Sequence, residues 1–492
     1  MTVSSYLTGS KGDSMVQTCQ AKQTDVIENE AQRVFSAQRA AYLRYPYPSA
    51  EERIENLHKV ERILIDNADA IADAINTDFG CRSVVESKLL EIFTSVDGIR
   101  YARKKVRSWM KPQRRHVSIL FATGSNRVIP QPKGVVGIVS PWNYPLFLAI
   151  SPLTYALAAG NRCMVKLATN SSTLCQLLAD KFKVKFPEDT VAILPGVKAQ
   201  DFSALPFDHM VFTGSADVGR TVMRSAAEGL TPVTLELGGK SPTIICDDFD
   251  VETAAERILY AKFVNAGQTC VAPDYLFVSE AKRDQFVAAA QRILTRRYPD
   301  PNNGSYTSIV DEKAYRRLRG TLDDAKKKGA KVISLVAGAT LNDKLRTIPP
   351  QLVLDPTDDM IIMRDEIFGP LLPVKTYRSI EEVLAYIKSK DRPLALYFFT
   401  HDKQLEQRIL YQTISGGVTI NNCLFQVAQH DMPFGGTGAS GMGQYHGYEG
   451  FVELSKMRGV FTNPKVSALH LFYPPYTKLH TRMFELLLKY KR

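Results

Sequence analysis

Gly134-Val-Val-Gly-Ile-Val139 is a short apolar run with several β-branched residues, and residues 146–159 after it have the composition of a proline-bounded helix. The same alternation continues along the chain. Strands are predicted at 163–166, 191–194, 210–213 and 233–236, with helices at 173–182 and 217–227. Apolar strands that alternate with helices of roughly 10–15 residues are typical of a parallel, doubly wound sheet.

A second alternating series begins near Ser241 and runs to about Thr419. It includes predicted strands at 275–278 and 371–376, and predicted helices at 251–263, 283–292 and 380–388. Residues 50–110 are rich in Ala, Leu, Glu and Arg at helical spacing, which predicts a layer of helices before both series. The glycine-rich run 435–447 is predicted to be a loop. The pattern therefore predicts an α/β protein with two sheet domains.

Length and composition exclude several classes of protein. The chain has 492 residues, 45% of them hydrophobic and 23% charged, which is typical of a globular protein with two or three domains. Seven cysteines without a CxxC pair argue against a disulfide framework and favour a reducing, cytoplasmic setting. No apolar run reaches the roughly 18 residues of a membrane span. Residues 1–24 are polar, so we expect a flexible arm rather than a signal peptide.

The net charge of +11 raises nucleic acid as a partner. The basic runs at 103–107, 114–115 and 326–328 are scattered and lack interleaved aromatic residues, so we expect no nucleic-acid site. None of the eight histidines has metal-ligand spacing with cysteine or a carboxylate, so no metal site is predicted.

Cys270 ends the run Asn265-Ala-Gly-Gln-Thr-Cys270, and Glu236 begins Glu236-Leu-Gly-Gly-Lys240 further up the chain. A cysteine reached through small residues, with a carboxylate on a separate glycine turn, suits two-stage thiol chemistry. The thiolate attacks a carbonyl, and a separate base then activates water against the thioester. The other cysteines are interpreted as small buried apolar residues: Cys19, Cys81, Cys163, Cys175, Cys246 and Cys423.

Two proline-bounded turns carry further candidates. In Pro141-Trp-Asn-Tyr-Pro145 the prolines would orient the Asn143 amide as the donor that an oxyanion needs, although a rigid turn with a solvated asparagine is equally open. Glu366-Ile-Phe-Gly-Pro370 places an acid and an aromatic side chain on one rigid loop. Taken alone, that loop would be interpreted as a surface turn.

Two glycine patterns compete as phosphate sites. Gly214-Ser-Ala-Asp-Val-Gly219 follows a predicted strand and opens a helix, where backbone N–H groups and the helix dipole can hold a pyrophosphate. With only two glycines, a turn without ligand is about as plausible. Gly436-Thr-Gly438-Ala-Ser-Gly441 matches GxGxxG but follows no strand, so it is rejected as the dinucleotide site.

Taken in order, these motifs resemble the NAD(P)-dependent aldehyde dehydrogenase superfamily from about residue 30 to the end of the chain. The motifs are Pro141-Trp-Asn-Tyr-Pro145, Phe212-Thr-Gly-Ser215, Glu236-Leu-Gly-Gly-Lys240, Gly267-Gln-Thr-Cys270, Glu366-Ile-Phe-Gly-Pro370 and Pro433-Phe-Gly-Gly436. Cys270-Val-Ala-Pro-Asp-Tyr275 and Phe472-Tyr-Pro-Pro-Tyr476 resemble the class 3 type, which includes coniferyl aldehyde dehydrogenases.

The resemblance implies a role for each matching residue. Cys270 would be the nucleophile, Asn143 and the Cys270 N–H would form the oxyanion hole, and Glu236 would be the hydrolytic base. An aldehyde, expected to be aromatic, would be oxidised to its acid with NAD or NADP. The implied cofactor-binding residues are Trp142, Lys166, Thr169, Gly214, Ser215, Gly219, Glu366 and Phe368. Of these, Lys166 would bind the adenosine ribose, Ser215 would lie near the pyrophosphate and Glu366 would hold the nicotinamide ribose, with Phe368 beside the nicotinamide.

One departure leaves the choice of cofactor open. Relatives often have Lys-Pro-Ser-Glu after the second strand, where this chain has Lys166-Leu-Ala-Thr169. The usual glutamate binds the adenosine ribose and repels a 2′-phosphate, and Thr169 removes that charge.

Several alternatives stay open beside an aromatic aldehyde. They are a semialdehyde or fatty aldehyde dehydrogenase, a CoA-acylating enzyme and a non-catalytic binding protein on the same fold. CoA-acylating relatives commonly lack the base, so Glu236 favours hydrolysis. The class 3 resemblance also implies a homodimer.

The predicted fold is a doubly wound parallel-sheet cofactor domain, a second α/β catalytic domain and a small oligomerisation extension. The predicted divisions are an arm over 1–24, a dinucleotide-binding domain over 25–237 with an oligomerisation segment near 115–132, a catalytic domain over 238–425, and residues 426–492, which return to the cofactor domain and form an oligomerisation tail.

Overall fold

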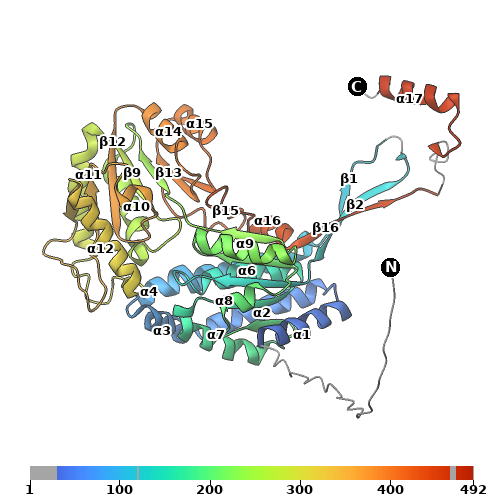
Figure 1. Cartoon of the computed structure of the whole chain (residues 1–492), viewed down its shortest axis with the longest axis horizontal. Coiled ribbons are helices and arrows are strands. Elements are labelled where there is room, and N and C mark those ends of the chain that lie inside the picture. Colours follow the sequence, from blue (N-terminus) through green and yellow to red (C-terminus); the bar gives the residue numbers. More distant parts are fainter. Residues whose placement is uncertain (1–29, 119–120, 466–471, 491–492) are drawn as a thin grey trace, which may run out of the picture.

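The computed structural model describes residues 30–118, 121–465 and 472–490 (Figure 1). The predicted N-terminal arm and Cys19 lie outside them. Two largely parallel sheets with helices on their faces form the body, and a three-stranded sheet extends away from it. The α/β class predicted from the sequence is therefore confirmed.

The first sheet has six strands in the order β15-β7-β6-β3-β4-β5. Five of them are parallel: β3 (Val135–Ser140), β4 (Arg162–Leu167), β5 (Val191–Ile193), β6 (His209–Thr213) and β7 (Val233–Glu236). The connections between them include α6 (Phe147–Ala159), α7 (Ser172–Lys185), α8 (Ala199–Ser203) and α9 (Ala216–Glu228). All the strands and helices predicted for this region are present. Every residue of α6 is buried, because this helix is apolar on all sides.

The predicted helical layer precedes this sheet. It contains α1 (Glu30–Arg44), α2 (Ala50–Asp66), α3 (Ala68–Phe79), α4 (Val84–Ser87), the π-helix η1 (Lys88–Phe93) and α5 (Thr94–Trp109). A capping box begins α2: Ser49 Oγ accepts from the Glu52 N–H, and the Glu52 carboxylate accepts from the Ser49 N–H. The helices α2 and α5 pack on each other and on α6, which buries their apolar faces.

The second sheet has seven strands in the order β10-β11-β12-β9-β8-β13-β14. They are β8 (Pro242–Ile245), β9 (Tyr275–Ser279), β10 (Lys331–Ser334), β11 (Gln351–Leu354), β12 (Leu371–Tyr377), β13 (Ala395–Phe399) and β14 (Gly417–Ile420). Only the β10–β11 pair is antiparallel. The helices are α10 (Val251–Phe263), α11 (Arg283–Arg297), α12 (Glu312–Lys327), α13 (Ile361–Arg364), α14 (Ile380–Lys388) and α15 (Lys403–Gln412). The predicted bounds of α10 and α14 match these helices at both ends.

The glycine-rich run 435–447 is not wholly a loop, so that prediction was partly wrong. Gly441–Met442 forms β15, whose Gly441 pairs antiparallel with Glu236 of β7. The Leu237 N–H also donates to the Ser440 carbonyl at 3.0 Å. A strand of two residues is too short to show an alternating pattern. The rejected GxGxxG motif accordingly meets the sheet edge, and α16 (Gly447–Glu453) begins only further on.

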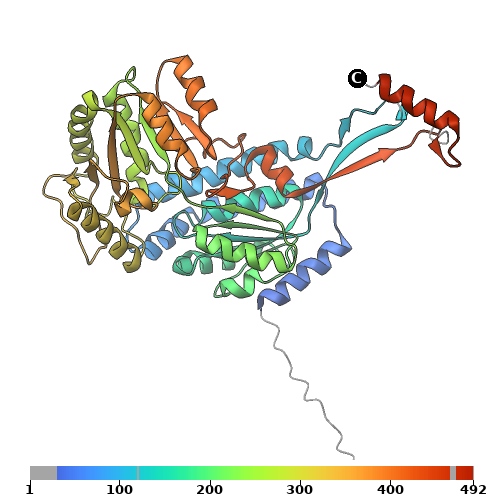
Figure 2. The same cartoon turned by 45° about the horizontal axis from the view of Figure 1, so that its top comes forward.

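The extension is built from segments far apart in the chain. β1 (Gln113–Arg115) and β16 (Ser455–Thr462) both pair antiparallel with β2 (Ser125–Pro132). Figures 1 and 2 show this sheet projecting from the body, with α17 (Lys478–Tyr490) near its outer end. The predicted domain boundaries remain predictions. In the described ranges, no helix is long and apolar enough to cross a membrane.

Most of the cysteines behave as small apolar residues. Cys163, Cys175, Cys246 and Cys423 are buried. Cys81 is only half-buried, because it lies where the chain leaves α3, and its thiol points to the Tyr306 carbonyl at 3.6 Å.

Candidate active site

The carboxyl edge of the first sheet gathers several of the predicted residues. Trp142 and Asn143 follow β3, Lys166 lies at the end of β4, and Gly214 follows β6. Since β4 and β6 flank β3 on opposite sides, the strand order reverses there. Open α/β sheets bind their ligands at such a reversal, outside the carboxyl ends of the strands.

Cys270 lies on a tightly held loop after α10. Asn265 and Ala266 adopt left-handed φ angles of 52° and 51° within η4 (Val264–Gly267). The Gln268 side chain donates to the carbonyls of Asn265, at 3.1 Å, and Ser308, at 3.0 Å. It also accepts from the Val310 N–H at 3.0 Å. This buried amide fixes the loop that presents Cys270.

The Cys270 side chain borders a cavity of about 240 Å³. Apolar and aromatic side chains dominate its wall, and none of the residues that line it is charged. They are Leu89, Leu90, Phe93, Thr94, Tyr144, Phe147, Leu148, Tyr260, Val264, Thr269, Val271, Leu424, Phe425, Val427, Ala428 and Phe434. The sequence patterns did not identify this wall, because its residues come from η1, α6, α10 and the 424–434 segment.

Glu236 is buried near Cys270 at the end of β7, with 2% of its surface exposed. In the part of the chain that the structure describes, neither carboxylate oxygen has a hydrogen-bond partner. Burial raises the pKa of Glu236 well above its usual value. Burial also raises the pKa of Cys270 to about 12, helped by the charges of Glu366 and Glu236. A carboxyl with so high a pKa is suited to accept a proton from water.

Ser215 and Glu366 border a second cavity, of about 430 Å³, which the Gly238–Gly239 turn also lines. Ser215 is the N-cap of α9 and makes no capping hydrogen bond with its side chain. The cavity wall also includes the cationic side chains Arg220, Lys240, Arg364, Lys390 and Arg392. A helix N-terminus among cations fits the pyrophosphate of a dinucleotide.

Glu366 approaches the backbone of the Gly238–Gly239 turn closely. Its Oε1 accepts from the Gly239 N–H at 3.0 Å. A Cβ placed on Gly238 would lie 2.0 Å from Glu366 Oε2, so an added methyl group would force the carboxylate to move. Burial raises the pKa of Glu366 to about 8, and the Asp274 charge adds to this effect.

Trp142 and Phe368 meet edge to face, with their ring centroids 5.4 Å apart. Phe368 has a left-handed φ of 47°, which turns the loop at this point. Arg317 donates to the Ile367 carbonyl at 2.8 Å and holds the loop. The two proline-bounded motifs therefore meet through Trp142 and Phe368, which are 226 residues apart in the chain.

Lys166, Thr169 and Gly219 lie outside both cavities. Lys166 is buried with its Nζ donating to the Leu167 carbonyl at 3.1 Å, and burial lowers its pKa. Thr169 is exposed in η3 (Thr169–Ser171). Gly219 packs so tightly in α9 that a Cβ would lie 2.7 Å from the Leu237 side chain. The roles predicted for these three residues in cofactor binding remain predictions.

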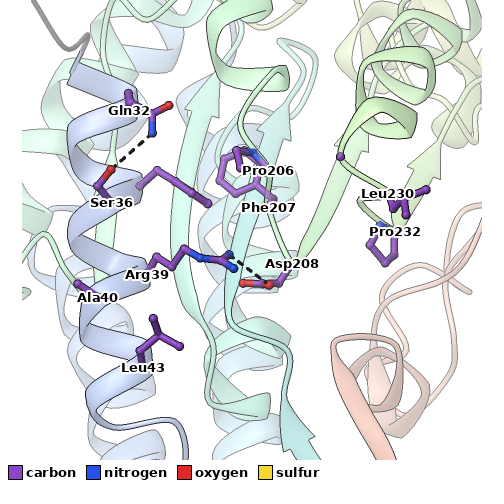
Figure 3. Close-up of a pocket in the computed structure, with 12 residues that line it drawn as sticks. Gln32, Ser36, Arg39, Ala40, Leu43, Pro206, Phe207, Asp208, Leu230 and Pro232 are labelled. Carbon is purple, nitrogen blue, oxygen red and sulfur yellow. Dashed lines mark hydrogen bonds and ion pairs between the residues drawn. The ribbon is translucent and has the colours of Figure 1, made fainter.

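A larger open cleft of about 760 Å³ lies elsewhere, between α1 and the loops near β6 and β7 (Figure 3). Arg39 and Asp208 form an ion pair of 3.7 Å within it. None of the predicted site residues lines this cleft. The candidate active site is therefore the smaller, apolar cavity at Cys270.

Comparisons with known proteins identify the family of this chain. A model of the aldehyde dehydrogenase family matches residues 11–460. The chain is 49% identical over 453 residues to the probable coniferyl aldehyde dehydrogenase of Pseudomonas aeruginosa, which covers 92% of this chain and 94% of that protein. It is 41% identical over 436 residues to the coniferyl aldehyde dehydrogenase of a Pseudomonas species, covering 88% and 90%.

Among solved structures, the substrate-bound AldH of Staphylococcus aureus aligns with a TM-score of 0.87 at 33% identity, over 94% of this chain and 100% of that chain. The family match spans most of the chain, and the fold agrees with that of the solved relative. The chain thus belongs to the aldehyde dehydrogenase family, whose members oxidise aldehydes to carboxylic acids with NAD(P)⁺.

Proposed function

We propose that this enzyme oxidises an aromatic aldehyde of the coniferyl type to its carboxylic acid, through a thioester on Cys270. One observation carries the proposal: Cys270 opens into an uncharged, mainly apolar cavity, and the buried Glu236 lies close enough for its charge to act on the thiol. An aromatic ring fits such a cavity, and its polar substituents can meet the hydroxyls of Tyr144, Tyr260 and Thr94.

We assign each step to a residue of this chain. The Cys270 thiolate attacks the carbonyl carbon, and the Asn143 amide with the Cys270 N–H holds the resulting oxyanion. A bound nicotinamide dinucleotide would accept the hydride and leave a thioester. Glu236 then removes a proton from the attacking water, and the acid departs as the Cys270 thiolate is released.

The cofactor would lie along the carboxyl edge of the first sheet. Ser215 and the start of α9 would hold the pyrophosphate, and Glu366 would accept hydrogen bonds from the nicotinamide ribose. Trp142 and Phe368 would flank the ring, while Lys166 and Thr169 would lie at the adenosine ribose. The uncapped start of α9 and the cations around it support this arrangement.

A panel of aldehydes tests the proposal, with formation of reduced cofactor as the readout. Coniferyl and related aromatic aldehydes should give the highest kcat/KM, and Cys270→Ala should abolish turnover, with mass spectrometry trapping the acyl group on Cys270 of the wild type. A carboxylate-bearing semialdehyde should react poorly, because no cation lines the cavity to pair with it. Activity in Cys270→Ala, or a clear preference for semialdehydes, would overturn the proposal.

A long-chain aliphatic aldehyde is the second candidate. Leu89, Phe93 and Phe425 line the cavity yet keep 50%, 60% and 47% of their surface exposed. An apolar rim of this kind could shield an alkyl tail that extends beyond the cavity. Rates that rise with chain length across aliphatic aldehydes would favour this candidate over the aromatic one.

The enzyme is further proposed to act as a homodimer in the cytoplasm. The projecting sheet of β1, β2 and β16 leaves two unpaired strand edges, which supports association through this extension. The described cysteines are all free, in keeping with a reducing compartment.

A further inference from the structure

We propose that the buried pair Arg82–Glu91 is a positioning unit that fixes the Asn143 turn against the substrate wall. The proposal rests on the role proposed above for Asn143. Neither residue touches the cavity at Cys270, so both would act through the residues that they hold.

Arg82 binds a carbonyl group of the turn that contains Asn143. Its Nη1 donates to Glu91 Oε1 at 2.6 Å and to the Asn143 carbonyl at 3.0 Å. The guanidinium also lies 4.8 Å from the ring centroid of Tyr144, a residue of the cavity wall. Because one cation contacts two successive residues of the turn, it limits how far the Asn143 backbone can rotate.

Glu91 binds backbone N–H groups at the other end of the same turn. Its Oε2 accepts from the N–H groups of Leu146, at 2.8 Å, and Phe147, at 3.2 Å, where α6 begins. A carboxylate at a helix N-terminus is favoured by the helix dipole. Residues 143–147 are thus held at both ends by one ion pair, and α6 starts at a fixed point.

The Asn143 carbonyl also connects this unit to the nucleophile loop. Asn265 Nδ2 donates to it at 3.0 Å and to the Gln268 carbonyl at 3.1 Å. The Asn143 carbonyl therefore accepts two hydrogen bonds, one from Arg82 and one from Asn265 in the loop that carries Cys270. A shift of Arg82 would change the separation of the predicted oxyanion donor and the thiol.

Glu91 lies in the π-helix η1, a segment that also contributes to the cavity wall. Leu89, Leu90 and Phe93 of this segment line the cavity. A π-turn spreads neighbouring side chains apart and is frequent at functional sites. In η1 the Glu91 carboxylate is buried against Arg82, while three apolar side chains of the same segment line the cavity. The ion pair therefore connects the cavity wall to the Asn143 turn.

Stability alone explains the pair poorly. Both side chains are fully buried, and Arg82 Nε and Nη2 have no hydrogen-bond partner within the described residues. Buried ion pairs can often be replaced by apolar residues of similar volume without loss of stability. A pair that is costly to bury but touches the catalytic turn at four backbone or ring positions is better explained by positioning.

The test is a double-mutant cycle on the full-length enzyme with coniferyl aldehyde and the cofactor. Arg82→Met should lower kcat on the order of 10–100-fold, as expected when a reacting group is misplaced by about 1 Å, with a small change in KM. In an Asn143→Ala background the same substitution should change kcat by less than about 2-fold, because the residue through which Arg82 acts is gone.

The apolar double variant Arg82→Met/Glu91→Leu separates positioning from stability. Its Tm should recover toward the wild-type value relative to either single variant, while kcat stays low. Recovery of kcat together with Tm would overturn the proposal, as would equal losses from Arg82→Met in both backgrounds. Should Arg82→Met fail to fold, Arg82→Lys takes its place in the cycle with the same expected non-additivity. Full activity of Asn143→Ala would instead count against the proposed role of Asn143.

Discussion

At the scale of single residues, the proposed role of Glu236 as the base can be tested with one substitution. Glu236→Gln keeps the shape of the side chain but cannot accept a proton from water. We expect an initial burst of reduced cofactor followed by steady turnover slowed by about 10²–10⁴-fold. Stopped-flow absorbance measures both phases. An unchanged steady-state rate would rule out Glu236 as the base.

The pH dependence of Cys270 gives a second prediction. Burial raises the pKa of this thiol to about 12, so the cofactor-free enzyme holds little thiolate at pH 7. Alkylation of Cys270 by iodoacetamide should therefore accelerate by about tenfold per pH unit up to at least pH 10. Mass spectrometry assigns the modified cysteine, and a rate that levels off below pH 9 would contradict the prediction.

The charge of Glu366 contributes to that raised pKa. Its own pKa is about 8, so it is ionised above that pH and repels the thiolate. Glu366→Gln should lower the pKa of Cys270 and speed its alkylation at pH 9 by several-fold.

Thr169 provides the prediction for cofactor choice. Its side chain is exposed just after β4. In the proposed arrangement of the cofactor, an added carboxylate at this position would face a ribose 2′-phosphate. Thr169→Glu should lower kcat/KM for NADP⁺ relative to NAD⁺, by a repulsion on the order of 1–3 kcal/mol. If the ratio stays the same, this position does not contact the ribose.

Sequence motifs pointed to the predicted reacting groups but not to the residues that we propose hold them in position. Cys270 and Glu236 were found because glycine and small residues surround them in recognisable runs. Arg82 and Glu91 were missed, because neither belongs to a recognisable motif: Arg82 lies between α3 and α4, and Glu91 lies nine positions later in η1. Only the fold brings both into a fully buried contact.

At the scale of elements, the Gly238–Gly239 turn is where we expect a small substitution to affect cofactor binding. Gly238→Ala would place a methyl group 2.0 Å from Glu366 Oε2 and displace the carboxylate. The KM for the dinucleotide should therefore rise about tenfold, which corresponds to a loss of about 1.4 kcal/mol in binding free energy. Gly320→Ala in α12 is the matched control, because nothing lies within 4 Å of its added Cβ. Equal KM values in the two variants would contradict the prediction.

Long regular elements were predictable and short or irregular ones were not. The helices α10 and α14 were predicted with their observed bounds, because each has an apolar stripe and a clear N-cap, Asp250 and Ser379. The two residues of β15 and the π-turn η1 have no such periodic signal. Their contacts are visible only in the fold: β15 pairs with β7, and Glu91 of η1 forms an ion pair with Arg82.

At the scale of the whole molecule, the pairing of distant segments decides the architecture. The sequence indicated two sheets but did not show that β16 lies against β2, since no local pattern encodes a partner more than 300 residues away. The same limit applies to the substrate cavity, whose wall combines η1 with the 424–434 segment.

The extension predicts a dimer. β1 and β16 are edge strands within the described chain, and Leu479, Phe484 and Leu488 of α17 are more than half exposed. Such surfaces favour association. Light scattering should give about twice the chain mass of 54.9 kDa. A monomer or tetramer mass would contradict the dimer.

The pairing of Gly441 with Glu236 has a consequence for synthesis on the ribosome. A nascent chain that has emerged as far as Gly435 already contains Asn143, Glu236 and Cys270, yet β7 is still an open strand edge. Open edges can pair with other strands, so the growing chain is open to misassociation at this stage. The first sheet gains its last strand only when the final tenth of the protein arrives, so we expect a chain terminated shortly before Gly441 to associate more readily than the full-length chain.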